Sequence, residues 1–393
     1  MRATGLGAIS LVIALTACAP APDAASPPRP SRTSSPTGPV PVPTSSSQTS
    51  PVPTSSATPG PPGSASAIQR VADDLLVAAG SPGAVVHVRD GGRVEEAAAG
   101  FADPATRTPM RVGHRFRIAS ITKTFTATIV LQLVRERRLA LRDTLGKLLP
   151  GVLPGADRVT VEQLLTHTSG IPDYLTDSRF MDAVVDGGMH TRDWPPRELL
   201  GYGGSPGKSG VNSYSNGNFI LLGLIIEKVT GQSYAEALRE RVTEPLRLRD
   251  TELPRDLRPP GLATGRQGDG PGATVVNSSI FWSAGGLVST AGDVGAFYEA
   301  LFGGRRAASG REPAKGSAPK RLPEGAALKR AGGLGVFADR LPCGTRVWNH
   351  SGMIYGYSGI AMSSEDGRRQ VVVQLNSPAA GQAIAAAGRL MCQ

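Results

Sequence analysis

The feature that most constrains the fold is a set of strand-like segments at both ends of the sequence, separated by a long stretch of helical patterns. Residues 83–88 and 94–99 are rich in valine and alanine and flank the turn signal Asp90-Gly91-Gly92, so they predict a β-hairpin. Three more strands are predicted near the C-terminus, at residues 346–349, 359–363 and 370–375. The simplest architecture is therefore α+β, with one antiparallel β-sheet built from both chain ends.

Helices are predicted on both sides of these strands. Ser66 is a typical N-cap, and apolar residues follow it at helical spacing. These residues are Ile68, Val71, Leu75, Leu76 and Val77. Residues 383–390 predict a helix at the other end. We expect the terminal helices to flank the sheet and the middle of the chain to form an inserted, mostly helical lobe.

The first 18 residues have the pattern of an export signal. Arg2 supplies a positive start, and residues 6–17 are apolar but too short to span a bilayer. The run Leu15-Thr16-Ala17-Cys18 resembles the lipobox of bacterial lipoproteins, in which the cysteine becomes the lipidated N-terminus. We expect Cys18 to be lipidated, and the alternative is an ordinary signal peptide with an incidental cysteine.

Residues 19–65 consist mainly of Pro, Ser, Thr and Ala, with almost no large apolar side chains. Such a segment cannot bury enough apolar surface to offset the entropy lost on ordering. It is predicted to be a disordered tether that reaches roughly 40 Å as a coil and roughly 150 Å as a polyproline-like chain. Folded structure is expected from residue 66 to residue 393.

Two cysteines remain after Cys18, namely Cys343 and Cys392. In an exported protein this even remainder predicts one disulfide, and two free buried thiols are the alternative. Two cysteines and five scattered histidines offer no ligand spacing for zinc, so no metal site is predicted.

The formal net charge of +10 is concentrated in one segment. Residues 304–330 hold eight basic side chains against two acidic ones, among many Gly, Pro, Ala and Ser residues. This composition predicts a solvated surface loop, with contact to anionic wall polymer or lipid headgroups as the alternative. Because an exported protein meets no chromosome, nucleic acid is not an expected partner.

The motif S-x-x-K occurs three times, beginning at Ser120, Ser205 and Ser317. Only the first match, Ser120 to Lys123, opens a long apolar run, while the other two lie among Gly and Pro. A spacing of three residues places Ser120 and Lys123 on one helix face. A lysine in apolar surroundings loses its charge readily and can accept the serine proton. The alternative is that Ser120 is a plain N-cap and Lys123 a snorkelling side chain.

Two further motifs follow along the chain. Tyr214-Ser215-Asn216 precedes an apolar helix, and His350-Ser351-Gly352 lies on a predicted strand. In the simpler interpretation, Tyr214 packs in a loop, Asn216 caps the helix and His350 is an edge-strand residue.

Taken in order, the three motifs resemble those of the serine β-lactamase and D-alanyl-D-alanine carboxypeptidase family, the penicillin-recognising serine hydrolases. Tyr-Ser-Asn stands where the class A enzymes have S-D-N, and His-Ser-Gly stands in place of K-T-G. This is the pattern of the class C β-lactamase-like branch, which the stretch Leu164-Leu165-Thr166-His167-Thr168-Ser169-Gly170 also resembles. The resemblance covers most of residues 66–393 and, with the lipobox, implies an actinobacterial-type lipoprotein.

The resemblance implies a role for each motif residue. Ser120 would attack a carbonyl group and form an acyl-enzyme, while Lys123 and Tyr214 would handle its proton. Asn216 would bind the substrate amide, His350 would orient Tyr214, and Ser351 would hold a substrate carboxylate. With Gly352 between them, the backbone N–H groups of Ser120 and Met353 would form the oxyanion hole.

Three further expectations concern Met353, His167 and cofactors. The bulky Met353, where the family has a small residue, is expected to reshape the acyl pocket. His167 is expected to be structural. No cofactor is expected.

The resemblance and the anchor together favour D-alanyl-D-alanine carboxypeptidase activity on peptidoglycan stem peptides. The site is expected on the outer face of the cytoplasmic membrane, in a monomer. One alternative is an esterase, a D-amino-acid amidase or a β-lactamase with the same machinery and another small acyl substrate. A second alternative is a non-catalytic penicillin- or wall-binding module.

The anchor is testable in the intact chain. Cys18→Ser should move the protein from the membrane fraction to the soluble fraction, because lipidation supplies the strong apolar attachment. The measurement is membrane fractionation followed by immunoblotting. A variant that still sediments with membranes would mean that the lipobox assignment is wrong or that the basic loop is the anchor.

Overall fold

The computed structural model of the chain describes residues 66–186, 188–266, 275–303 and 334–393. The signal with Cys18, the tether, the basic loop and the third S-x-x-K match lie outside the described residues. No helix in the described ranges is both long and apolar enough to cross a membrane.

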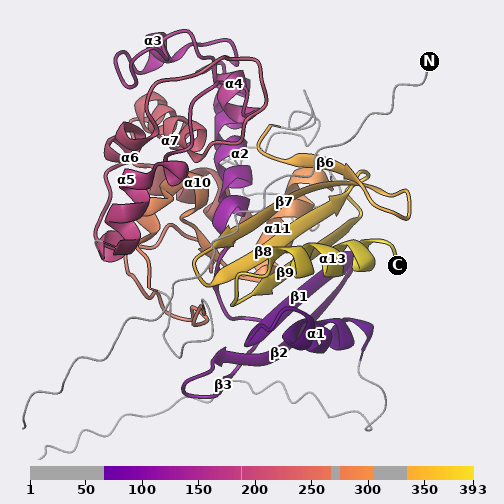
Figure 1. Ribbon diagram of the computed structural model, residues 1–393. Helices are drawn as coiled ribbons and strands as arrows, with labels where there is room; N and C mark the ends of the chain where they lie inside the picture. The colour runs from indigo at the N-terminus through magenta and orange to yellow at the C-terminus, as the bar shows by residue number, and fades with distance from the viewer. Residues whose placement is uncertain (1–65, 187, 267–274, 304–333) are drawn as a thin grey trace, which may run out of the picture. The chain divides into compact units, whose positions relative to one another are not determined.

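A seven-stranded antiparallel sheet joins the two ends of the folded chain (Figure 1). Its order is β3-β2-β1-β9-β8-β7-β6. The strands are β1 (Gly83–Asp90), β2 (Arg93–Asp103), β3 (Thr108–Pro109), β6 (Phe337–Arg340), β7 (Arg346–Ile354), β8 (Tyr357–Ser364) and β9 (Arg369–Leu375). The first strand pairs with the last from Ala84↔Leu375 to Asp90↔Arg369. The predicted sheet built from both chain ends is confirmed.

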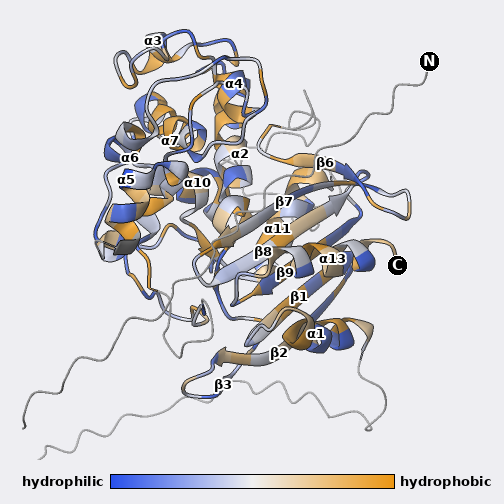
Figure 2. Cartoon of the chain, in the orientation of Figure 1, coloured by the Kyte–Doolittle hydropathy of each residue, from blue (hydrophilic) through white to orange (hydrophobic). Residues whose placement is uncertain are grey.

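Helices cover both faces of this sheet. α1 (Ala67–Ala78) and α13 (Ala380–Met391) pack on one face, while α11 (Ala291–Phe302) packs on the other. The alternation of strand side chains explains the two layers, because Val86 contributes to the core under α1 and α13, whereas Val85 contributes to the larger core. Both α1 and α13 carry hydrophobic and hydrophilic residues, as expected of helices with one buried face (Figure 2).

The predicted helical lobe lies between β3 and β6 in sequence. Two short strands, β4 (Phe116–Arg117) and β5 (Val288–Ser289), pair with each other beside it. Its α-helices are α2 (Thr122–Arg135), α3 (Leu145–Leu148), α4 (Val161–Leu165), α5 (Ser178–Met181), α6 (Pro196–Gly203), α7 (Asn216–Thr230), α8 (Tyr234–Leu238), α9 (Glu244–Leu246) and α10 (Trp282–Gly285). The 3-10 segments are η1 (Ala119–Ile121), η2 (Tyr174–Thr176), η4 (Met189–Thr191) and η6 (Ser278–Ile280), and the π-helical segments are η3 (Asp182–Asp186) and η5 (Arg239–Thr243).

The central element of the lobe is α2, whose residues are all buried from Thr122 to Leu133. A helix surrounded by protein has no exposed stripe, which is why its polar residues, Lys123 among them, are also removed from water. The turn η1, which leads into α2, contacts β7 and β8. The lobe and the sheet therefore meet at Ser120.

Three local predictions need adjustment. Val77 was placed on the apolar face of α1 but is 87% exposed, because it lies in the last turn, beyond the helix face that contacts the sheet. Ser120 lies in the 3-10 turn η1, just before the α-helix that was predicted to begin with it. The strand predicted at residues 346–349 continues to Ile354, so it includes the whole His-Ser-Gly motif.

Cys343 and Cys392 are joined by a disulfide. The bond ties the residue that follows α13 to the connection between β6 and β7. It thus links the end of the chain to the hairpin that carries His350.

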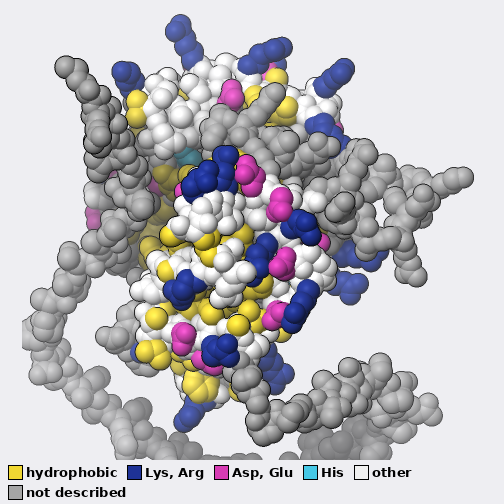
Figure 3. All heavy atoms as spheres, turned by 90° about the vertical axis from the view of Figure 1, so that its right-hand side faces the viewer, with side chains coloured by type: hydrophobic (Ala, Val, Ile, Leu, Met, Phe, Trp, Pro, Cys, Tyr) yellow, Lys and Arg dark blue, Asp and Glu magenta, His cyan; other side chains and the backbone are white. Residues whose placement is uncertain are grey.

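The face on the right of Figure 1 carries basic and acidic side chains intermingled with hydrophobic ones (Figure 3). Ion pairs of the sheet include Arg369–Asp90 at 2.9 Å and Arg93–Glu95 at 2.8 Å. Exposed pairs of this kind contribute little to stability.

Candidate active site

Ser120 is placed by a strained turn. The preceding residue, Ala119, has a φ of +48°, in the left-handed region that residues with a Cβ rarely adopt. Such a conformation costs on the order of 1–3 kcal/mol, and it persists only when the surrounding structure enforces it. Here the Ile118 N–H donates to the Leu287 carbonyl oxygen at 3.1 Å, and β7 packs against the turn.

Gly352 allows β7 to approach this turn. A Cβ atom at this position would lie 2.4 Å from the Ile118 carbonyl oxygen and 3.1 Å from the Ser120 nitrogen. The first distance is a clash with backbone, so only glycine fits. The backbone of β7 therefore runs directly beside the N–H group of Ser120, as the predicted oxyanion hole requires.

The amine of Lys123 is fully buried. Its Nζ atom lies 3.0 Å from Ser120 Oγ, 2.7 Å from Asn216 Oδ1 and 2.7 Å from the Ala284 carbonyl oxygen. Removal from water disfavours the charged form and lowers the pKa of Lys123 to about 7, although the nearby Asp173 carboxylate opposes the shift. The neutral amine is therefore populated near neutral pH.

The contacts of the neutral amine determine where its lone pair points. A neutral lysine has two N–H donors and one lone pair. The oxygens of Asn216 and Ala284 can only accept, so they take both donors. The lone pair is left facing Ser120 Oγ, which is the arrangement that a base for this hydroxyl needs.

Tyr214 completes the hydrogen bonds of the nucleophile. Its hydroxyl lies 2.9 Å from Ser120 Oγ, and burial raises its pKa, so it remains an O–H donor. Its ring stacks on His167 with centroids 4.3 Å apart. The Nδ1 atom of His167 accepts the Ser215 N–H at 3.1 Å, and burial holds the pKa of this imidazole well below its usual value. His167 therefore supports Tyr214 as a neutral, packed ring.

The side-chain amide of Asn216 has hydrogen-bond partners that the sequence did not predict. Its Oδ1 contacts Lys123, and its Nδ2 donates to Asp173 Oδ2 at 2.8 Å. Both ends of the amide are thus engaged within the protein, and the predicted contact with a substrate amide stays a prediction. Asp173 was missed by sequence reasoning, and the available signal was an acidic residue three positions after the Thr166-His167-Thr168-Ser169-Gly170 stretch.

His350 is 2% exposed on β7, with the ring of Phe337 at 5.2 Å. Burial, assisted by the charge of Lys123, lowers its pKa to about 3, so it is neutral at physiological pH. Its Nδ1 lies 2.7 Å from the Ser351 carbonyl oxygen, which can only accept, so the proton is on Nδ1 and the lone pair on Nε2. Among the described contacts of Tyr214, the stacked ring is His167 and not His350.

The pleat of β7 sets the direction of the Ser351 and Met353 side chains. Because Gly352 faces the Ser120 turn, the side chains of its two neighbours leave from the opposite face of the strand. Met353 is 50% exposed. This geometry does not support the expectation that its bulk reshapes the acyl pocket, while its backbone N–H remains a predicted oxyanion donor.

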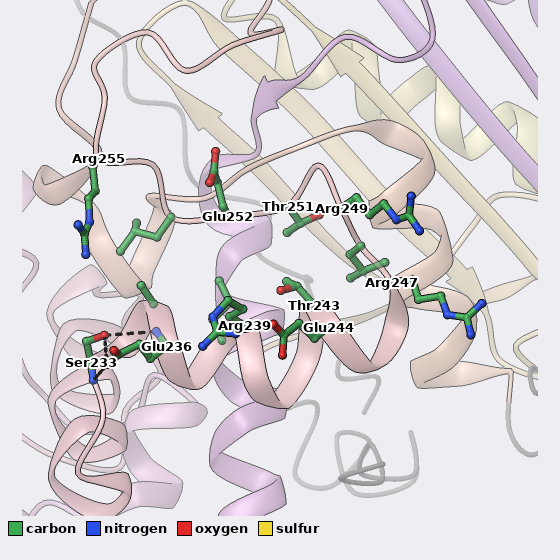
Figure 4. Close-up of a pocket in the computed structure, with 14 residues that line it drawn as sticks. Ser233, Glu236, Arg239, Thr243, Glu244, Arg247, Arg249, Thr251, Glu252 and Arg255 are labelled. Atoms are coloured by element: carbon green, nitrogen blue, oxygen red, sulfur yellow. Dashed lines mark hydrogen bonds and ion pairs between the residues drawn. The ribbon is translucent and has the colours of Figure 1, made fainter. Parts of the chain in front are cut away.

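Other candidate sites lack such an arrangement. Ser205 and Lys208 are both exposed in the loop before α7. A surface pocket of about 540 Å³ lies elsewhere, lined by residues between 233 and 255 (Figure 4). Its serine, Ser233, is engaged with Glu236 in a capping box, and Arg247 and Arg255 lie at opposite ends of it. Among the described residues no group of acidic, histidine or cysteine side chains could hold a metal ion.

Comparisons with known proteins show the family of the chain. The family model described as Beta-lactamase matches residues 68–390. A D-stereospecific amidohydrolase from Streptomyces sp. has 33% sequence identity and a TM-score of 0.69, with 81% of this chain and 98% of that chain covered. The D-aminopeptidase of Brucella anthropi is 30% identical over 301 residues, which is 76% of this chain and 56% of that protein.

A penicillin-binding protein 4 from Amycolatopsis lactamdurans is 34% identical over 180 residues, or 42% of this chain and 43% of that protein. The chain thus spans about half the length of these two curated relatives. The family model covers nearly all of the folded chain, and the Ser120, Lys123 and Tyr214 side chains meet in one hydrogen-bonded cluster. The chain therefore belongs to the beta-lactamase family of serine hydrolases, whose fold it shares.

Proposed function

We propose that this chain is an amidohydrolase that forms an acyl-enzyme on Ser120 and cleaves amide bonds next to D-amino acids. The observation that carries the proposal is the geometry of the site, in which Ser120 Oγ lies 3.0 Å from Lys123 Nζ and 2.9 Å from the Tyr214 hydroxyl. The amine of Lys123 is partly neutral, the imidazole of His350 is neutral, and the hydroxyl of Tyr214 keeps its proton.

The terminal carboxylate of a carboxypeptidase substrate is bound most strongly where a cation faces it, because charge-assisted hydrogen bonds are the strong ones. Within the described ranges, Lys123 is the only lysine or arginine that contacts Ser120 or Tyr214, and it is fully buried. His350, where the related motif has lysine, supplies no positive charge. This favours a substrate without a carboxylate at the cleaved end, as in an amino-acid amide. The similarity to a D-stereospecific amidohydrolase and a D-aminopeptidase supports the same choice over D-alanyl-D-alanine carboxypeptidase activity.

The proposed chemistry follows from the hydrogen bonds. Ser120 Oγ attacks the substrate carbonyl carbon as its proton passes to the Lys123 lone pair. The resulting oxyanion accepts hydrogen bonds from the N–H groups of Ser120 and Met353, a contribution often worth about 3 kcal/mol. Tyr214 donates its proton to the leaving amine as the C–N bond breaks, and the proton on Lys123 restores the tyrosine hydroxyl. Water then attacks the acyl-enzyme and releases the acid, with Ser120 regaining its proton.

We further propose that the protein works at the outer face of the cytoplasmic membrane, held through lipidated Cys18 and the tether of residues 19–65. Such a tether would let the site act on small substrates within the cell wall.

Substrate selectivity tests the proposed function. The values of kcat/KM should be compared for D-alanine amide, L-alanine amide, an N-acyl-D-Ala-D-Ala peptide, a simple ester and a β-lactam. We expect the D-amide to exceed its L-enantiomer and the peptide by at least about 100-fold, which corresponds to about 2.7 kcal/mol. Preference for the D-Ala-D-Ala peptide would restore the carboxypeptidase interpretation. Stable acylation by the β-lactam without turnover of any substrate would indicate a binding module.

The nucleophile is tested by labelling. Ser120→Ala should abolish covalent labelling by a fluorophosphonate probe, because it removes the only serine hydroxyl that the described contacts pair with a lysine and a tyrosine. Ser205→Ala is the matched control, since it alters the second S-x-x-K match, and it should label like the wild type. Intact mass spectrometry reports both. Labelling that survives in the Ser120 variant would refute the assignment.

The charge of His350 is tested by pH–rate profiles. For the wild type, kcat/KM should rise with pH through the pKa of Lys123, near 7, because the neutral amine is the active form. His350→Gln keeps a neutral polar group and should cost less than about tenfold, with the rising limb in place. His350→Lys forces a second amine into a buried site and should cost more than about 100-fold. A lysine variant that outperforms the glutamine variant would show that the site requires a cation.

A further inference from the structure

In the described part of the chain, the half-buried carboxylate of Asp173 is hydrogen-bonded to the catalytic network. It lies in the loop after α4, directly before η2. Its Oδ2 accepts the Asn216 Nδ2–H at 2.8 Å, and its Oδ1 accepts the Leu175 N–H at 3.2 Å. The described hydrogen bonds of Lys123 Nζ go to Ser120, Asn216 and Ala284, so the effect of Asp173 on that amine passes through Asn216 or through space.

We propose that Asp173 is a positioning residue that fixes the side-chain amide of Asn216 so that its oxygen, and not its nitrogen, faces Lys123. The proposal rests on the proposed catalytic roles of Ser120 and Lys123.

The chemistry of the three groups requires this orientation. An ionised carboxylate can only accept hydrogen bonds, so it holds the NH₂ end of the amide on its own side. The oxygen is thereby turned toward Lys123 Nζ, 2.7 Å away. In this arrangement the amide oxygen takes one N–H of the neutral amine and leaves the lone pair for Ser120.

The flipped amide would have the opposite effect. Its NH₂ group would point at Lys123 and would attract the lysine lone pair, which would then be lost to Ser120 Oγ. With a charged lysine, two donors would face each other. The orientation of one amide therefore decides whether Lys123 serves as a base for the nucleophile.

Asp173 also acts electrostatically. Its negative charge raises the pKa of Lys123, against the larger effect of burial. Burial raises the pKa of Asp173 itself, while hydrogen bonds from the Leu175 N–H and the Asn216 side chain, together with the charge of Lys123, oppose that shift and favour the ionised carboxylate. The remaining titratable groups that face this carboxylate are the hydroxyls of Tyr174 and Tyr214, and their pKa values are raised. Both tyrosines therefore stay neutral, and Lys123 is the only cation in the network.

The test separates positioning from a structural role. Asp173→Asn keeps the size and the cap of η2 but can present either a donor or an acceptor to Asn216, so both amide orientations become possible. Asp177→Asn is the matched control, because Asp177 caps the next turn by accepting the Arg179 N–H at 2.9 Å and has no contact with the site. Asp173→Glu keeps the charge while displacing the carboxylate.

Two measurements read the effect without using any amide substrate. The first is the NMR titration of ¹³C-labelled lysine, which is tractable because the chain has seven lysines and Lys123 can be assigned by substitution. The second is the rate of fluorophosphonate labelling of Ser120 as a function of pH. Both remain informative if the enzyme hydrolyses none of the D-amino-acid amides, so a failure of the proposed substrate class is distinguishable.

We expect Asp173→Asn to lower the Lys123 pKa by about one unit, because an attractive charge is removed. Its labelling rate should fall by roughly 10- to 100-fold at a pH where Lys123 is neutral. Asp173→Glu should restore the pKa but only part of the rate, and Asp177→Asn should change neither. If Asp173→Asn fails to fold, Asp173→Glu still decides, since a wild-type labelling rate in that variant would overturn the proposal. An unchanged Lys123 pKa in folded Asp173→Asn, or an equal change in Asp177→Asn, would also overturn it.

Discussion

The complete burial of one lysine amine organises this molecule. Transfer of an ammonium group from water into a protein interior costs several kcal/mol, so the fold must provide partners for it or accept its neutral form. The chain does both, since three oxygens surround Lys123 Nζ and its pKa lies at about 7. The strained turn at Ala119, the central position of α2 and the amide of Asn216 all serve to place acceptors around this amine. A more exposed lysine would remain charged and could not take a proton from serine.

The architecture could be predicted from the sequence because strand-like segments at both ends differ in pattern from the helical spacing in the middle. β-branched runs at both ends predicted the sheet, and the pairing of β1 with β9 follows from them. The S-x-x-K, Tyr-Ser-Asn and His-Ser-Gly motifs led to Ser120, Lys123, Tyr214 and Gly352, which the structure brings together. Their spacing in the chain contains no information on orientation, however. Local patterns could not show that Asn216 is turned inward or that Met353 leaves β7 on the far face.

Asp173 illustrates what sequence reasoning cannot supply. A lone aspartate before a 3-10 turn has the ordinary role of a cap, and Asp173 does cap η2. Its second contact, with Asn216, depends on the packing of the α4–η2 loop against α7. Likewise, the neutral state of His350 depends on burial by Phe337 and the lobe, which no motif encodes. The charge state of a site is a property of the assembled core, whereas its residue types are a property of the sequence.

The pairing of β1 with β9 also bears on when the contacts of the site form during folding. The strand that presses on the Ser120 turn belongs to the C-terminal third of the chain, and its neighbours β8 and β9 complete the sheet on β1. Contacts of such long sequence separation form late and slowly, because the intervening chain must first be closed into a loop. The backbone of Gly352 reaches its place beside Ser120 only when such a long-range contact has formed. The geometry of the nucleophile thus depends on a contact between residues that lie far apart in the sequence.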